Sequence, residues 1–171
     1  AVLKTGTLGM ETGTSLVISS GGVLSTSSLL TGYSILLGTQ NAPNAQIILD
    51  NGTINVEGVT ALDGLFLGDT HKIRVQATSV INVNTIGLDT GSALELVVSG
   101  KNKQEACLTI NFSGDPYAGF KGYRFLSAGT LTLESSETLD KGDYKLIHLE
   151  EVSGSSLYAA FADYCNWADG Y

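Results

Sequence analysis

The sequence predicts an all-β fold, a right-handed parallel β-helix of about five coils. Short apolar strands recur in the same order of three, and the segments between them are rich in Gly, Asn, Asp, Ser and Thr. Helical periodicity is missing except near the end of the chain. Because one coil cannot bury its apolar face alone, the coils must stack about 4.8 Å apart.

The first strand of each coil alternates apolar and polar residues, as in TINVEG at 53–58 and VINVNT at 80–85. These strands are marked by Leu3, Leu24, Ile54, Ile81 and Leu108, at spacings of 21, 30, 27 and 27 residues. The variation in length falls at 40–44, 100–105 and 113–122. We interpret these segments as loops that leave the corners of the coils, where function is expected to lie.

The second strand has an apolar residue followed by Gly in four coils, and the third has apolar residues two positions apart. The second-strand pairs are Leu8 and Gly9, Leu37 and Gly38, Leu67 and Gly68, and Ile86 and Gly87, with Phe125 and Leu126 in the fifth coil. The third-strand pairs are Leu16 and Ile18, Ile47 and Leu49, Ile73 and Val75, Leu94 and Leu96, and Leu131 and Leu133. A β-sandwich is the structural alternative, although it does not require this order to recur.

We divide the chain into coils at 1–133 and a C-terminal cap at 134–171 of the same domain. Residues 1–133 carry 9 acidic and 7 basic residues (net −2), whereas 134–171 carry 8 and 2 (net −6). The aromatic residues concentrate in the C-terminal third, at Tyr117, Phe120, Tyr123, Phe125, Tyr158, Phe161, Tyr164 and Trp167. We expect the aromatic-rich segment to cover the open end of the core, because exposed strand edges promote aggregation. The strand-like start suggests a mature fragment or an excised domain.

Charge and composition exclude several classes of partner. With 9 basic and 17 acidic residues the net charge is −8, so the counterion release that drives nucleic-acid binding is absent. No apolar run reaches the ~20 residues that cross a bilayer, and we expect no membrane-spanning segment. No cofactor and no metal site are predicted, and the acidic Glu134, Glu137, Asp140 and Asp143 are interpreted as a solvated face rather than a calcium site.

The cysteines and histidines give little direct evidence of chemistry. Cys107 and Cys165 are too few for a zinc site; in an oxidising compartment they either bond to each other or stay as two thiols. Strand alternation places Cys107 on the outer face, opposite Leu108. His71 and His148 stand alone in the sequence, and we expect both on the surface.

Two segments, GTSLVISSGGVLST and GTLTLESSETLDKGDYKLIHLEEVSG, resemble the passenger regions of autotransporter-type proteins. In that family Gly, Thr and Ser-rich coils lead to a closing stretch with a Gly, aromatic, Leu, Ile pattern, matched here by Gly142, Tyr144, Leu146 and Ile147. The resemblance implies a secreted or surface-displayed bacterial rod. It presents loops, adheres to neighbouring surfaces, or holds an enzyme away from the cell.

A second resemblance concerns LDTGSA at 88–93, which is similar to the active-site loop of aspartic proteases. It implies that Asp89 is the catalytic carboxylate, Thr90 the hydroxyl that orients the loop, and Gly91 the residue that permits the turn. The chemistry needs two carboxylates that share one proton. LDNGT at 49–53 matches this motif in part and has Asp50 at the position of the catalytic Asp, but Asn51 replaces the residue with the hydroxyl. A homodimer with one motif per copy is also compatible with the sequence.

The function expected from these patterns is a noncatalytic extracellular adhesive module whose loops contact host glycoprotein or glycan. The alternative is a secreted aspartic endopeptidase that acts on mucin-like glycoprotein through Asp89. A β-helix corner explains Asp89 as well, because Asp69 and Thr70 precede it by one coil. A polysaccharide lyase or hydrolase is a third interpretation, weakened by sparse and scattered basic residues.

Overall fold

The computed structural model describes residues 1–10, 13–31, 45–56, 65–68, 71–83, 86–88, 90–112, 125–127, 129–135 and 137–151. Within these ranges the regular elements are β-strands and one short 3₁₀ helix, η1 (Gly100–Lys103). Paired strands are parallel throughout the described part. The prediction of an all-β fold with parallel pairing is confirmed.

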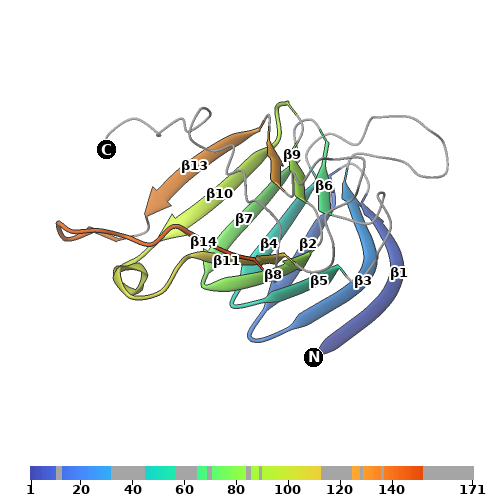
Figure 1. The fold of residues 1–171 in the computed structure, drawn as a ribbon, viewed down its shortest axis with the longest axis horizontal. Helices are drawn as coiled ribbons and strands as arrows, with labels where there is room; N and C mark the ends of the chain where they lie inside the picture. Colours follow the sequence, from blue (N-terminus) through green and yellow to red (C-terminus); the bar gives the residue numbers. More distant parts are fainter. Residues whose placement is uncertain are drawn as a thin grey trace.

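The strands form three rows. Within each row the strands lie side by side in sequence order (Figure 1). The first row consists of β1 (Val2–Met10), β3 (Val23–Thr31), β5 (Thr53–Val56), β8 (Ser79–Val83), β11 (Leu108–Phe112) and β14 (Ile147–Glu151). The second row consists of β6 (Leu65–Leu67), β9 (Ile86–Leu88) and β12 (Phe125–Ser127). The third row consists of β2 (Ser15–Ser19), β4 (Gln46–Asp50), β7 (Lys72–Ala77), β10 (Ala93–Val98) and β13 (Thr130–Ser135).

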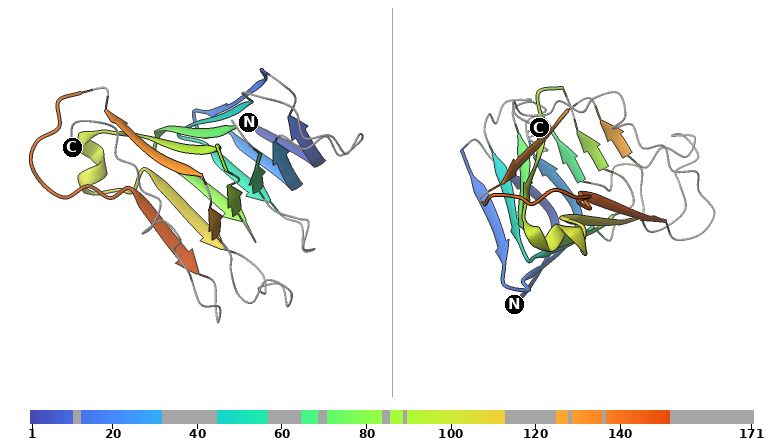
Figure 2. Two further views of the ribbon diagram at one scale, coloured as in Figure 1. Left: turned by 90° about the horizontal axis from the view of Figure 1, so that it is seen from above. Right: turned by 90° about the vertical axis from the view of Figure 1, so that its left-hand side faces the viewer.

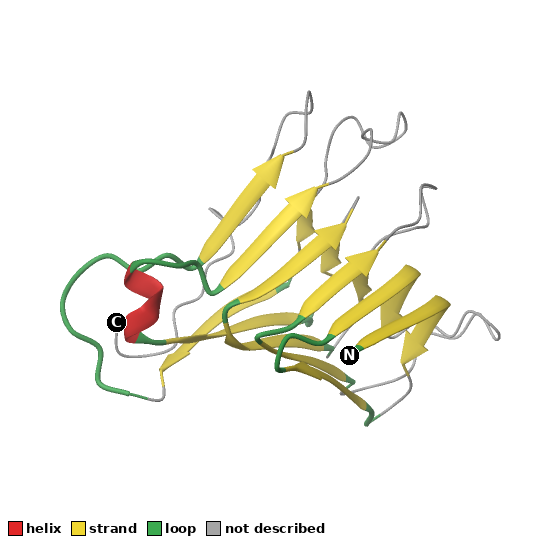
Figure 3. Cartoon of the chain, turned by 90° about the horizontal axis from the view of Figure 1, so that it is seen from below, coloured by secondary structure: helices red, strands yellow, loops and turns green. Residues whose placement is uncertain are grey.

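The first two rows belong to one sheet because β3 is long enough to serve both. Its residues 23–26 pair with β5 and its residues 29–31 pair with β6. Among the described residues this sheet has nine strands, and the third row forms a separate five-stranded sheet. In Figure 3 the arrows of each row point the same way, as parallel pairing requires.

The predicted third strands of successive coils pair with one another in register. One column, meaning residues at the same register position in successive strands, contains Leu16, Ile47, Ile73, Leu94 and Leu131. A second contains Ile18, Leu49, Val75, Leu96 and Leu133. All five predicted pairs are therefore confirmed, because strand alternation turns both columns toward the core.

The first-row prediction is confirmed for four rungs and wrong at the fifth. Leu3, Leu24, Ile54 and Ile81 lie in register on parallel strands. Ile110 continues this column, whereas Leu108 lies beside Ser79. A shift of two residues keeps the same face of the strand, so apolar alternation alone does not detect it.

The second-row prediction needs a larger correction. Leu8 pairs with Leu29, and Leu29 pairs with Leu65, so Leu29 occupies the position predicted for Leu37. Leu37 lies outside the described residues. In the next coil Leu65, rather than Leu67, pairs with Ile86. The cause is that β3 runs through the corner as a single strand of nine residues, without a Gly or Pro to interrupt it.

The core lies between the facing sheets and is filled by the apolar columns. Leu24, Ile54, Ile81 and Phe112 are each at most 2% exposed. Cys107 is 1% exposed and belongs to this core, so the prediction that it faces outward is wrong. It lies just before β11 begins, where the chain turns in from a corner, and strand alternation does not extend to it. Cys165 lies outside the described residues, and a bond between the two cysteines stays a prediction.

The corner between the third and first rows is tight and is built on backbone contacts between coils. Asn51 has a φ of 56°, and its carbonyl accepts a hydrogen bond of 2.7 Å from the backbone of Gly21 in the preceding coil. Gly52 follows, where a Cβ would lie 2.5 Å from the carbonyl oxygen of Ile18. Only glycine fits this close approach.

The predicted cap begins within the described residues. Residues 147–151 form β14, which adds a parallel strand to the first row beside β11. Residues 152–171, which hold Tyr158, Phe161, Tyr164 and Trp167, lie outside the described part of the chain. The assignment of 134–171 as a cap therefore stays a prediction.

Candidate functional site

Thr90 and Gly91, from the protease-like motif, lie at the corner that leads into β10. Both are exposed, and Gly91 has a φ of 85°, a left-handed conformation that glycine adopts without strain. Asp89 itself lies outside the described residues. Behind the corner, the backbone of Ala93 donates a hydrogen bond of 2.9 Å to the carbonyl oxygen of His71, which ties β10 to β7. The conformation of Gly91 is therefore explained by the turn into β10.

Asp50 lies at the opposite edge of the same sheet. It ends β4 and is exposed, and it pairs in register with Ala77 at the end of β7. The motif at 88–93 instead precedes β10, whose first residue, Ala93, pairs with Lys72 at the start of β7. Five residues of β7 separate these positions, a distance of about 16 Å at about 3.3 Å per residue. The structure therefore does not bring Asp50 and Gly91 together.

The two histidines lie in different environments. His148 is exposed on β14, as expected, but His71 is only 1% exposed, and its expected surface position is wrong. Residues 71, 73 and 75 share one face of the strand, and this alternation, visible in the sequence, directs His71 toward the core together with Ile73. The neighbouring rungs hold Ala45 and Ser92, small residues that leave room for an imidazole.

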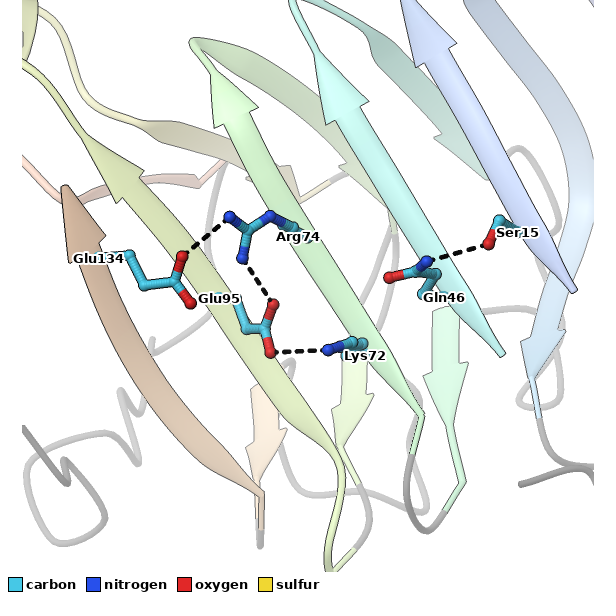
Figure 4. A network of polar contacts seen from close by, with 6 residues as sticks. All are labelled: Ser15, Gln46, Lys72, Arg74, Glu95 and Glu134. Atoms are coloured by element: carbon cyan, nitrogen blue, oxygen red, sulfur yellow. Dashed lines mark hydrogen bonds and ion pairs between the residues drawn. The ribbon is translucent and has the colours of Figure 1, made fainter. Parts of the chain in front are cut away.

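The outer face of the third row carries a ladder of ion pairs across β7, β10 and β13 (Figure 4). Arg74 bridges Glu95 at 3.1 Å and Glu134 at 2.8 Å, and Lys72 bridges Glu95 at 3.0 Å. Glu95 is the most shielded member, with a side chain 14% exposed. The hydrogen bond to Arg74 lowers the pKa of Glu134 and that to Glu134 raises the pKa of Arg74. These charges neutralise one another and form a structural ladder.

The outer face of the first row carries a ladder of amides that we did not predict. Asn82 donates to Asn55 at 2.6 Å, Asn111 donates to Asn82 at 2.7 Å, and Asn55 donates to the hydroxyl of Ser25 at 3.2 Å. The ladder ends at Asn111, whose Oδ1 is buried with no hydrogen-bond donor among the described residues. The next rung holds Glu150, and an ionised carboxylate only accepts hydrogen bonds. The triplets INV at 54–56, INV at 81–83 and INF at 110–112 repeat the asparagine in the sequence and could have predicted this ladder.

The C-terminal end of the stack is covered in part by residues 137–146, which we call the strap. Figure 2 shows the strap (orange) beside η1, at the end of the stack away from β1. The backbone of Lys145 donates to the carbonyl of Asn102 at 2.7 Å, and its Nζ donates to the carbonyl of Gln104 at 2.8 Å. Asn102 is 3% exposed and donates in turn to the carbonyl of Glu105 at 3.1 Å. The strap is thus held by the backbone carbonyls of Asn102 and Gln104, and the buried side chain of Asn102 stabilises the turn that presents them.

Tyr144 lies between two hollows on either side of the strap. Its hydroxyl donates to the carbonyl of Asp140 at 2.7 Å, and Lys103 Nζ lies 5.4 Å from the centre of its ring. One hollow, of about 310 Å³, is lined mainly by apolar side chains, including Val98, Leu133 and Leu139. The other, the end groove, measures about 670 Å³ and is lined by Thr78, Gln104, Glu105, Ala106, Thr109, Tyr144, Lys145, Leu146, Ile147 and His148. Its aromatic ring and hydrogen-bonding side chains suit a polyhydroxylated ligand.

The acidic residues of this end make protein contacts. Glu137 Oε1 accepts a hydrogen bond of 2.6 Å from the backbone of Gly100, and Asp140 lies 3.9 Å from Lys103 Nζ. Among the residues that the structure describes, no group of three or more His, Cys, Asp or Glu side chains is arranged to hold a metal ion.

A comparison with protein families, curated proteins and solved structures found no match to this chain. Within the described ranges no helix has the length and apolar character needed to cross a bilayer.

Proposed function

We propose that this chain is a right-handed parallel β-helix of the autotransporter passenger type, and that it acts outside the cell as a noncatalytic adhesive module for glycan or glycoprotein. The observation that carries this proposal is that the rows keep their register although the connections at one corner vary in length. The proposal joins the resemblance of the sequence to this family with that observation.

The connections between the first and second rows differ greatly in length without disturbing the register of the strands they join. β1 and β3 pass this corner unbroken, whereas residues 57–64, 84–85 and 113–124 separate the later strands. Ile54, Ile81 and Ile110 nevertheless stay in register on one side, as Leu65 and Ile86 do on the other. A scaffold that tolerates insertions at one corner suits the display of recognition loops.

The end groove supplies a second surface of matching chemistry. It combines the ring of Tyr144 with the side chains of Gln104, Thr109 and His148. Aromatic faces stack on sugar rings, while amide and hydroxyl groups exchange hydrogen bonds with sugar hydroxyls. In the sequence, the connection between β11 and β12 carries three further aromatic residues, Tyr117, Phe120 and Tyr123.

The experiment measures binding of the purified chain to immobilised mucin-type glycoprotein, before and after enzymatic removal of its glycans. We expect binding that depends on the glycans. Tyr144→Ala should weaken it about tenfold, the loss of about 1.4 kcal/mol expected for one stacked ring. Gln76→Ala, at an exposed position near the end of β7, is the matched control and should bind like the wild type. Binding that is unchanged by removal of the glycans and by Tyr144→Ala would contradict the proposal.

A proteolysis assay at acid pH separates this proposal from an aspartic endopeptidase. The wild-type chain and Asp89→Asn are incubated with the same glycoprotein, and the products are identified by mass spectrometry. The adhesive proposal expects no cleavage by either protein. Cleavage by the wild type that disappears in Asp89→Asn would contradict the adhesive proposal and support an aspartic endopeptidase.

A further inference from the structure

The corner between β4 and β5 contains a dipeptide with a chemistry of its own, Asn51 followed by Gly52. In such a pair the backbone nitrogen of the glycine can attack the side-chain carbonyl carbon of the asparagine, because glycine has no side chain to hinder the approach. Of the asparagines in the sequence, only Asn51 is followed by glycine. Asn51 is also exposed, so water reaches its side chain. The corner therefore holds the asparagine with the least hindered route to this reaction.

Hydrogen bonds from the two neighbouring coils hold the peptide between these residues. The carbonyl of Asn51 accepts a bond of 2.7 Å from the backbone of Gly21 in the preceding coil. The N–H of Gly52 donates to the hydroxyl of Ser79 in the next coil at 3.2 Å. The carbonyl of Gly52 accepts a bond of 3.0 Å from the backbone of Val80. The peptide is thus fixed from both sides.

The bond to Ser79 bears directly on the reaction, since the nitrogen of Gly52 must leave its acceptor and lose its proton when it attacks. Ser79 is 1% exposed, and its hydroxyl donates to the carbonyl of Ala77 at 2.8 Å. This second bond directs the hydroxyl proton away from Gly52, so that the oxygen accepts there. Gly52 is itself buried, and moving its N–H away from Ser79 costs the free energy of a buried hydrogen bond.

We propose that Asn51 is a site of spontaneous deamidation, and that Ser79 restrains the reaction in the folded chain by holding the nitrogen that attacks. When the corner opens, a bond forms between the backbone nitrogen of Gly52 and Cγ of Asn51. The bond from Cγ to the side-chain amide nitrogen breaks, and this nitrogen leaves as ammonia with the proton from Gly52. Water then opens the cyclic imide and gives aspartate or isoaspartate at position 51.

The product would disturb the stacking of the coils. It adds a carboxylate next to the exposed Asp50, and isoaspartate also lengthens the backbone by a methylene group within the peptide that Gly21 and Val80 contact. Restraint by Ser79 therefore preserves the register at this corner. None of these residues lines the end groove, so the inference does not depend on the glycan-binding role.

Incubation of the purified chain in mildly alkaline buffer, with and without urea, followed by peptide mass mapping, tests the proposal. Conversion is detected as the mass increase from amide to acid at Asn51, and fragmentation by electron transfer distinguishes isoaspartate from aspartate. We expect Asn51 to convert readily in urea and about tenfold more slowly, or less, in the folded chain. The absence of conversion in urea would contradict the reactivity of the pair, and equal rates in the two conditions would contradict the restraint.

Two substitutions at Ser79 test its role. Ser79→Ala removes the acceptor and should accelerate conversion in the folded chain about tenfold, the factor that corresponds to one buried hydrogen bond, without changing the rate in urea. Ser79→Cys keeps the shape of the side chain but accepts hydrogen bonds weakly, so it should accelerate conversion as well. A rate in the folded variants equal to that of the wild type would remove Ser79 from the proposal.

Ile81→Val is the matched control for lost stability. Ile81 lies on the same strand, is 0% exposed and loses a buried methylene group, while the bond between Gly52 and Ser79 stays. Urea denaturation of the variants compares their stability. Ile81→Val should convert like the wild type. Equal acceleration in Ile81→Val and Ser79→Ala would show that conversion follows unfolding of the whole chain, and would overturn the restraint by Ser79.

Discussion

Leu3 and Leu24 form a matched pair for testing whether burial between coils determines stability. They are in register on adjacent strands, and Leu→Ala removes the same atoms from each. Leu24 is 2% exposed and lies between Leu3 and Ile54 in its column. Leu24→Ala leaves a cavity there and should lower the free energy of unfolding by about 2–5 kcal/mol.

Leu3→Ala should cost far less, although the substitution is chemically identical. Leu3 is 56% exposed, so less than half of its surface is shielded from water in the folded chain. A fully buried leucine contributes about 1.5–3 kcal/mol, and the shielded fraction gives roughly 0.5–1 kcal/mol for the atoms removed. No cavity penalty is added, because solvent occupies the space.

Urea denaturation followed by circular dichroism measures both values. The slope of the free energy against urea should be the same for both variants, so that the shift in midpoint reports stability. Equal losses in the two variants, or a loss below about 1 kcal/mol for Leu24→Ala, would refute the claim that stacking of coils buries the core.

Three further predictions concern a corner, an ion pair and a thiol. Gly52→Ala should lower the free energy of unfolding by about 2 kcal/mol or more in urea titrations, because its Cβ would lie 2.5 Å from a backbone oxygen, whereas Gly100→Ala meets its nearest atom at 3.6 Å and should be nearly neutral. Because the pKa of Glu134 is lowered in the folded chain, its bond to Arg74 stabilises the fold fully above the ordinary glutamate pKa of about 4.3, and this stabilisation is lost as the pH falls through the folded pKa. Arg74→Met should therefore lose less melting temperature than the wild type when the pH is lowered below about 4.3. An equal loss of melting temperature in both proteins over this acid range would contradict the role of the pair. Burial raises the pKa of the Cys107 thiol to about 11, so under reducing conditions at pH 8 it should resist iodoacetamide until urea unfolds the chain, as peptide mass mapping can test; rapid labelling of the native protein would be the contrary result.

The sequence pattern predicted the third row well because that row has a regular length and clear apolar alternation. Each of its strands places two large aliphatic residues on one face, as Ile47 and Leu49 do. The second row was harder to predict. Leu29 lies in a strand that bends through a corner without a Gly or Pro, so no turn signal marks where one row ends and the next begins.

The candidate site was less predictable than the fold, because its parts lie far apart in the sequence. Tyr144 and Thr109 reach the same groove only because the strap contacts η1, and the pairing of Lys145 with Asn102 creates that contact. In the protease-like motif, Gly91 adopts the left-handed conformation that a turn uses, a role that short motifs share with many corners. A local match therefore predicts local geometry more reliably than it predicts chemistry.

The amide ladder explains how this chain distinguishes between registers that its apolar pattern treats as equal. Sliding β11 by two residues would place Leu108 beside Ile81 and keep an apolar side chain toward the core, which is the error that alternation produced. The same slide would move Asn111 away from Asn82 and break a hydrogen bond of 2.7 Å between partly buried amides. Leaving such groups without partners costs about 1–3 kcal/mol. The outward polar column therefore selects the register, while the inward apolar columns supply most of the stability.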